Sequence, residues 1–224
     1  PQWGNITGGH KAGKNVLAVA NLLYDGSLVN SSSRGPASDG RLKPDLAANG
    51  NGQWTPDPFN TYRSSGGTSA AAPSAAGVIA QLYQAFRDIN GGLEANAALI
   101  KAIVLNTAED LGQPGPDFSF GWGRIDGRRA LRTLQQGNFQ FGSVSQGSEV
   151  NLGINIPAGM TEARIMLYWL DPEASPLAGR ALINDLDLKV LRNNTSFLPL
   201  VLDPTPNPVT LNQPAVPGVD TLNN

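Results

Sequence analysis

The chain has 224 residues with 16 basic and 18 acidic side chains, so its formal net charge is −2, and it contains no cysteine. This length can bury a sizeable core and is sufficient for two modules. The nearly balanced charge gives no electrostatic reason to expect binding to nucleic acid or to an anionic membrane, and the lack of cysteine excludes disulfides and thiol chemistry. No apolar run approaches the roughly 20 residues that span a bilayer, so we expect no membrane span.

The first predicted element is a buried strand. Residues 16–20 read Val-Leu-Ala-Val-Ala, a continuous apolar run typical of a central strand in a parallel sheet that is covered on both faces. The glycine-rich segment before it, residues 8–13, is expected to be a loop. It holds His10, the only histidine of the chain, which is therefore the only local candidate for a general base.

A second apolar stretch, residues 42–48, carries an aspartate, Asp45. A buried carboxylate there would need a partner. Residues 49–52, Asn-Gly-Asn-Gly, indicate a flexible turn. The segment from there to Ser65 holds several bulky side chains, including Trp54, and is expected to be an exposed, variable loop.

Residues 66–73 read Gly-Gly-Thr-Ser-Ala-Ala-Ala-Pro and lead into a run of small and apolar residues that ends near Asp88. The run predicts a helix buried on nearly every side. Because Pro73 cannot lie deep in a helix, the helix must begin a few residues before it, which places Ser69 in or just ahead of the first turn. A serine there suits either an N-cap or a nucleophile whose attack generates an oxyanion. The small neighbours favour the second role, since they let a substrate backbone approach.

Two further helices are predicted, over residues 94–108 and over residues 126–134 with Asp126 as the N-cap. From residue 138 the pattern changes to segments that alternate with period two, separated by Gly, Pro and Asn turns. This alternation indicates an antiparallel β-sandwich or jelly roll. We place the boundary between the two parts at residues 135–137. The segments with this alternation are residues 139–141, 150–156, 163–169 and 186–190.

Several motifs, in one order, resemble the subtilisin-like serine proteases. The nucleophile signature of that family is similar to residues 67–73, and the flanking segments agree with it. These segments are residues 14–19, 32–36, 39–45, 99–108 and 121–123. The resemblance implies an α/β three-layer fold with a parallel sheet, present here in part as residues 1–135, followed by the β-sandwich, residues 138–224, which we expect to be truncated.

The resemblance also implies roles for individual residues. Ser69 would be the nucleophile of a serine endopeptidase, and its backbone N–H would be one donor to the oxyanion. Gly8, Gly67 and Thr68 would line the substrate pocket. The family's catalytic histidine lies much earlier than His10, so a loop histidine that shapes the pocket wall is the better interpretation of His10.

Two metal sites are open possibilities, although the chemistry of the family requires no cofactor. Similar proteases use the aspartate that matches Asp45 structurally, in some cases beside a weakly held cation, so a scaffold role comes first and a metal role second. Asp185 and Asp187 would lie on one side of a strand, where clustered carboxylates suit calcium. Solvated surface aspartates are the more common alternative.

The catalytic aspartate, histidine and oxyanion amide would all precede this chain, so the chain alone is expected to be inactive. We expect it to be paired with a missing N-terminal half of the same protease and to act on protein or peptide substrates. Residues 43–50 resemble exported bacterial members of the family, which implies a secreted or cell-surface protein. Two alternatives remain: a catalytically dead pseudoprotease that binds peptides, and an adhesive or carbohydrate-binding module carried by residues 138–224.

Overall fold

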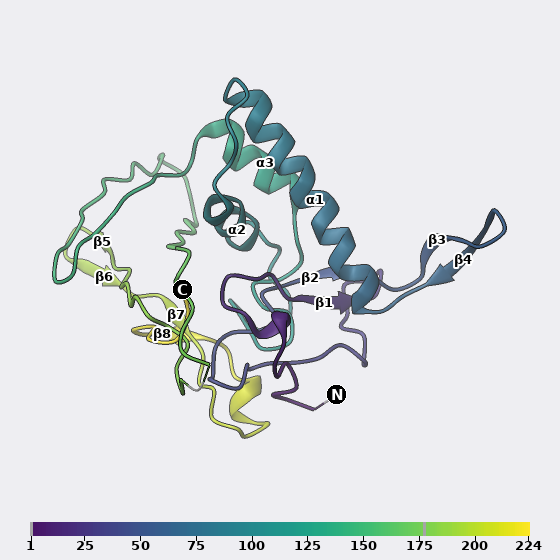
Figure 1. Ribbon diagram of the computed structural model, residues 1–224. Helices are drawn as coiled ribbons and strands as arrows, with labels where there is room; N and C mark the ends of the chain where they lie inside the picture. Colours follow the sequence, from purple (N-terminus) through teal and green to yellow (C-terminus); the bar gives the residue numbers. More distant parts are fainter. Residues whose placement is uncertain (1, 177) are drawn as a thin grey trace.

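The computed structural model describes residues 2–176 and 178–224 (Figure 1). The three α-helices lie in the part of the chain up to residue 137, and the remainder is mostly irregular with a few short strands. In chain order the elements are η1 (His10–Ala12), β1 (Val19–Leu22), β2 (Leu46–Asn49), β3 (Gln53–Asp57), β4 (Thr61–Ser65), α1 (Thr68–Ile89), α2 (Ala97–Asn106), α3 (Gly127–Gln136), β5 (Val190–Arg192), β6 (Thr195–Phe197), β7 (Leu200–Val201), η2 (Thr210–Asn212) and β8 (Val216–Pro217).

The expected parallel sheet is present in part. Strands β1 and β2 run parallel, with Val19 opposite Leu46. Residues 123–125 lie on the other side of β2, where the Ala47 N–H donates to the Gly123 carbonyl at 2.8 Å and the Ile125 N–H donates to the Ala47 carbonyl at 2.9 Å. The predicted strand at residues 16–20 therefore begins later than its apolar run, at Val19, and continues to Leu22.

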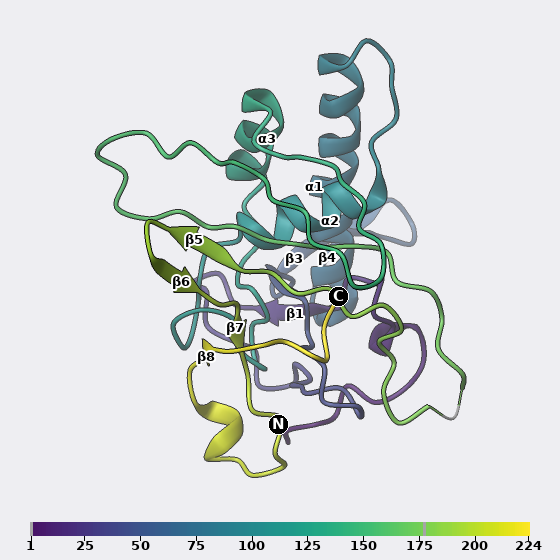
Figure 2. The same ribbon diagram turned by 90° about the vertical axis from the view of Figure 1, so that its left-hand side faces the viewer.

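Apolar side chains cover both faces of this sheet, as a central parallel pair requires. One face packs against all three helices, which lie together on that side (Figures 1 and 2). There Leu46 and Ala48 of β2 meet a core supplied by α1, α2 and α3. On the opposite face Ala20, Leu22 and Ala47 pack against side chains from loops, namely Leu28, Leu111 and Phe120.

The three helices form close to their predicted positions because the sequence carries their end signals. The side chain of Asn96 caps α2 by accepting from the Ala98 N–H, and Asp126 caps α3 by accepting from the Arg129 N–H. Gly137 ends α3 in the left-handed conformation with φ 64°, which glycine adopts without a steric penalty. This end coincides with the boundary at residues 135–137, and the division into two domains stays a prediction.

The prediction that the α1 helix is buried on nearly every side is wrong. Its buried residues are Ala71, Ala75, Leu82 and Phe86, which form one stripe toward the sheet and the other helices. The small residues of the opposite face are exposed, including Ala72, Ala76, Gly77 and Ala80. A composition of small residues permits burial on all sides, but only the side that meets another element is buried.

A β-sandwich in residues 138–224 is not confirmed. The segments 139–141, 150–156 and 163–169 form no strand, and of residues 186–190 only Val190 belongs to one. What forms instead is two hairpins, β5 with β6 and β7 with β8. Period-two alternation determines which side chains share a face, but a strand also needs a neighbour for its backbone hydrogen bonds. Within the described residues, the segment 150–156 has no such neighbour.

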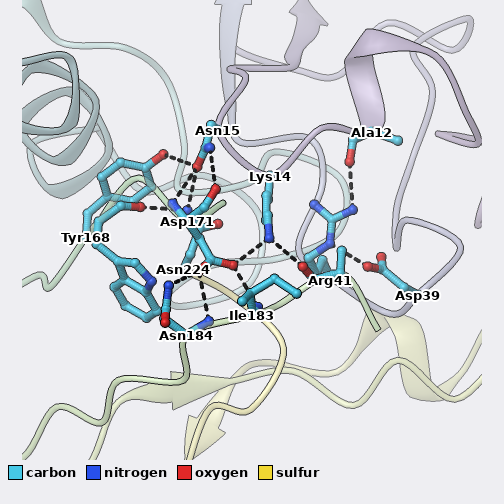
Figure 3. Close-up of polar contacts among 12 residues, drawn as sticks. Ala12, Lys14, Asn15, Asp39, Arg41, Tyr168, Asp171, Ile183, Asn184 and Asn224 are labelled. Atoms are coloured by element: carbon cyan, nitrogen blue, oxygen red, sulfur yellow. Dashed lines mark hydrogen bonds and ion pairs between the residues drawn. The ribbon is translucent and has the colours of Figure 1, made fainter. Parts of the chain in front are cut away.

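Residues 138–224 are attached to the first part of the chain through a buried carboxylate (Figure 3). The side chain of Asp171 is fully buried and accepts from the Lys14 ammonium at 2.5 Å. It also accepts from the backbone N–H groups of Ile183 and Asn184, each at 2.8 Å. Lys14 donates to the Ala181 carbonyl as well. One carboxylate thus organises a turn of the second part and binds it to the first.

A matched pair of substitutions tests this attachment. Asp171→Ala leaves the Lys14 ammonium buried without a counterion, so we expect the free energy of unfolding to fall by about 3–5 kcal/mol. The control is Asp185→Ala, which removes an exposed ion pair with Arg180 and should cost no more than about 1 kcal/mol. Denaturant unfolding of both variants measures the difference, and equal stabilities would contradict the attachment.

Candidate active site

The site begins at the first turn of α1. Gly67 is the N-cap residue, with φ 111° and no side-chain capping hydrogen bond, and Thr68 is the first helical residue. Ser69 is therefore inside the helix and exposed, so it is not the N-cap. In this turn the Ala70 N–H donates to the Gly67 carbonyl at 2.9 Å, and the first N–H groups of a helix lie at the positive end of its dipole. Ser69 thus stands where an oxyanion would be stabilised.

A close backbone contact sets the position of this turn. Gly50 follows β2 and is buried, and its carbonyl accepts from the Gly67 N–H at 2.9 Å. A Cβ on Gly50 would lie 2.4 Å from the Ala71 nitrogen and 2.7 Å from the side-chain oxygen of Asn21 on β1. Both distances are shorter than real Cβ contacts, so only glycine lets β1, β2 and α1 meet here.

Gly50 is a site residue that sequence reasoning missed. The sequence suggested a flexible turn at residues 49–52, whereas Asn49 ends a strand and Gly50 is held against the helix. The available signal was a glycine directly after a buried strand, which often marks a close backbone approach.

Ser69 lies on an open hollow of about 400 Å³. We call it the Ser69 hollow. Its walls come from the first turns of α1 and from the β3–β4 hairpin, which projects from the body beside the start of α1 (Figure 1). The lining residues are Gln53, Trp54, Thr55, Ser65, Gly66, Ser69, Ala70, Pro73 and Ser74. An extended polypeptide could therefore reach the hydroxyl of Ser69.

The other expected pocket residues lie in different places. Gly67 and Thr68 directly precede Ser69 in the chain, and neither lines the hollow. His10 begins the η1 turn and Gly8 lies shortly before it. Both residues are exposed, and neither lines the Ser69 hollow. Among the described residues, no histidine therefore stands beside the Ser69 hollow to serve as a base.

Asp45 has partners that explain its burial. Its carboxylate accepts from the Lys43 ammonium at 2.5 Å, lies 3.2 Å from the Lys101 ammonium, and accepts from the Ala18 N–H at 2.7 Å. Two cations already neutralise it, so the arrangement does not fit a metal ligand and supports the scaffold role. Burial lowers the pKa of Lys43 to about 8 and also lowers the pKa of Lys101.

The second possible metal site, at Asp185 and Asp187, gains no support from the structure. Asp185 and Asp187 are exposed, and Asp185 pairs with Arg180 at 2.6 Å. Across residues 2–176 and 178–224, no group of three or more His, Cys, Asp or Glu side chains is arranged to hold a cation. These residues do not fit a calcium site.

Known proteins similar to this chain are described as proteases. The family model of the subtilase family, peptidase S8, matches residues 4–123. The extracellular serine protease of Serratia marcescens is 36% identical over 138 residues, which cover 52% of this chain and 12% of that protein. The serine protease/ABC transporter B family protein tagA of Dictyostelium discoideum is 29% identical over 199 residues, 70% of this chain and 11% of that protein.

The chain thus spans about a tenth of the length of these curated relatives. Among solved structures, the CspB protease of Clostridium perfringens is 26% identical, with a TM-score of 0.47 over 54% of this chain and 27% of that one. In the part of the chain that the structure describes, no helix has the length and apolar character needed to cross a membrane.

The Gly50 contact predicts a large effect from one methyl group. Gly50→Ala should lower the free energy of unfolding by about 1–3 kcal/mol, because α1 or β2 must shift to accommodate the Cβ. The control is Gly77→Ala, an exposed position of α1 with nothing within 4 Å of a new Cβ. It should be neutral or stabilising by up to about 1 kcal/mol. Denaturant unfolding measures both variants. If the free energy of unfolding of Gly50→Ala equals or exceeds that of Gly77→Ala, the contact is contradicted.

The buried lysine predicts an unusual pH dependence. Unfolded Lys43 keeps its proton up to its ordinary pKa of 10.5, whereas the folded protein releases it near pH 8. Between these values the unfolded state binds more protons, so the free energy of unfolding should rise with pH. Above pH 10 the trend should weaken, since burial raises the pKa of Tyr168 from 10.0 to about 12 and unfolding then releases its proton.

Denaturant unfolding between pH 7 and pH 10 measures this slope, and Lys43→Met should reduce it. A wild-type profile that is flat or falls over this range would contradict the assignment to Lys43.

Proposed function

The chain belongs to the subtilase family of serine proteases, and we propose from this that it is the nucleophile-bearing part of a serine endopeptidase, with Ser69 as the nucleophile. The observation that carries the proposal is the placement of Ser69, which is exposed in the first turn of α1 and lines an open hollow. A serine in that position is accessible and can attack the carbonyl carbon of a bound peptide.

The proposed reaction uses this chain for two tasks. The Ser69 oxygen forms a bond to the peptide carbonyl carbon while its proton passes to a histidine. The Ser69 N–H and the positive end of α1 stabilise the negative charge that develops on the carbonyl oxygen. The C–N bond then breaks, the amine leaves with the proton from the histidine, and water releases the acyl group from Ser69.

Among the described residues, no histidine lines the hollow to act as a general base. His10 is the only histidine and does not line the hollow. We therefore propose that the general base, the aspartate that orients it and a second oxyanion donor belong to an N-terminal part of the same protease. That part would also cover apolar surface that α1 leaves exposed, such as Ala72 and Ala76.

We further propose that the protease is secreted and cleaves proteins. The support is the description of the Serratia marcescens relative as an extracellular serine protease. The surface around Ser69 agrees with a polypeptide substrate, because the hollow is open rather than enclosed.

The test of the proposed function is the loss of one hydroxyl. In the full-length protein, Ser69→Ala should abolish labelling by a fluorophosphonate probe and lower peptide hydrolysis by about 10⁶, the loss known for the nucleophile of subtilisin, another member of this family. The control is Ser74→Ala. Ser74 lines the same hollow, but its hydroxyl donates to the Ala70 carbonyl at 2.9 Å, so its loss should change hydrolysis less than threefold.

Absence of Ser69 labelling in folded, full-length wild-type protein would overturn the proposal. Peptide binding without labelling would then identify a pseudoprotease.

A further inference from the structure

The chain contains Asn-Gly pairs at residues 49–50, 51–52 and 90–91. In such a pair the backbone nitrogen of the glycine can attack the side-chain amide carbon of the asparagine, because glycine has no side chain to hinder the approach and lets the backbone bend into a ring. The attack requires an asparagine side chain that can turn toward the glycine and a glycine N–H that is not donated elsewhere. The three pairs differ in both respects.

Two of the pairs are held by hydrogen bonds. Asn49 ends β2, where its side chain donates to the Leu22 carbonyl at 3.3 Å, and the Gly50 N–H donates to the same carbonyl at 3.4 Å. Asn90 is the C-cap of α1, and its side-chain amide donates to the Phe86 carbonyl at 2.8 Å. Turning either asparagine toward the following glycine would break these bonds.

The third pair, Asn51 and Gly52, is not held in this way. Both residues are exposed in the bend between β2 and β3, where Gly52 has φ 68°. Within residues 2–176 and 178–224, no hydrogen bond restrains the Asn51 side chain or the Gly52 N–H. The pair therefore meets both requirements for attack.

Asn51 also lies against the segment that leads into α1. A Cβ placed on Gly66 would be 3.4 Å from the Asn51 Cα and 3.4 Å from its side-chain oxygen, and Gly66 lines the Ser69 hollow. The residue before Asn51 is Gly50, whose carbonyl accepts from the Gly67 N–H at 2.9 Å. A change in the backbone at residue 51 would therefore displace the turn that positions Ser69.

We propose that Asn51 is a site of spontaneous deamidation, and that its conversion to isoaspartate displaces the start of α1 and inactivates the Ser69 site. The Gly52 nitrogen loses its proton to hydroxide and forms a bond to the side-chain carbon of Asn51. The carbon–nitrogen bond of the side-chain amide breaks, and ammonia leaves with a proton from water. A second water molecule then opens the succinimide ring at either carbonyl, which gives aspartate or isoaspartate without any oxidant or reductant.

Isoaspartate changes the path of the backbone. The chain then runs through the former side chain and is longer by one carbon–carbon bond, about 1.5 Å. A shift of about 1 Å in a catalytic group can lower a rate by about 100-fold. The loss of activity rests on the proposed function, whereas the reaction at Asn51 does not.

The experiment follows ageing of the full-length protein at neutral and alkaline pH. Isoaspartate is measured by enzymatic methylation of its carboxylate and located by mass spectrometry of the peptides that contain residues 49–52 and residue 90. It should accumulate first at residue 51, at a rate that rises with the hydroxide concentration. Labelling of Ser69 by a fluorophosphonate probe should fall in parallel, and the isoaspartate form should hydrolyse peptides about 100-fold more slowly.

Two variants separate Asn51 from other causes of ageing. Asn51→Gln, whose longer side chain must form a less favourable six-membered ring, should accumulate no isoaspartate at residue 51 and should retain its labelling. The matched control is Asn90→Gln, which removes another Asn-Gly pair and should age like the wild type. An Asn51→Gln protein that loses activity as fast as the wild type would overturn the proposal, as would isoaspartate that forms first at residue 49 or 90.

A second readout separates this inference from the proposed function. If fresh protein is never labelled at Ser69, the proposed function fails, and the thermal unfolding midpoint replaces activity as the measure of the displaced helix start. The midpoint should fall in aged wild type and stay constant in Asn51→Gln. Isoaspartate at residue 51 without a change in labelling, hydrolysis or midpoint would reject its effect on the site.

Discussion

The arrangement around Ser69 depends on the contact between the end of β2 and the first turn of α1. Gly50 allows it, because any side chain there would collide with the Ala71 nitrogen. The contact joins the sheet to the helix, and the Gly50 carbonyl holds the Gly67 N–H directly ahead of the serine. A helix start that is held by backbone atoms has little freedom to move, which is what a nucleophile with a fixed angle of attack requires.

Two buried aspartates hold the surrounding structure in different ways. Asp45, directly before β2, lies between the ammonium groups of Lys43 and Lys101. The Asp171 carboxylate accepts hydrogen bonds from the Lys14 ammonium and from two backbone N–H groups. It thereby joins residues 138–224 to the first part of the chain. Buried charges of this kind add little stability when they are complete, but removing one partner is costly. They therefore specify how the segments fit together more than they stabilise the fold.

The exposed surface near Ser69 lies where the site lacks catalytic groups of its own. The chain offers the proposed nucleophile and the positive end of a helix, and among its described residues no histidine lies beside them. The exposed small residues of α1 and the projecting hairpin flank the same serine. Both are consistent with the proposal that other parts of a larger protease complete the site.

The sequence by itself determined the local features: the three helices and their caps, the buried strand, the place of Ser69 in a first turn, and the family. These depend on neighbours in the chain, such as Pro73, Asp126 and Gly137, whose effects are nearly independent of context. Only the tertiary structure decided what depends on distant partners. It showed Gly50 in a backbone contact, Asp45 paired with two lysines, and one buried stripe on α1. The alternating segments after residue 138 illustrate the same limit, because alternation selects a face but a sheet exists only where a second strand is present to pair with it.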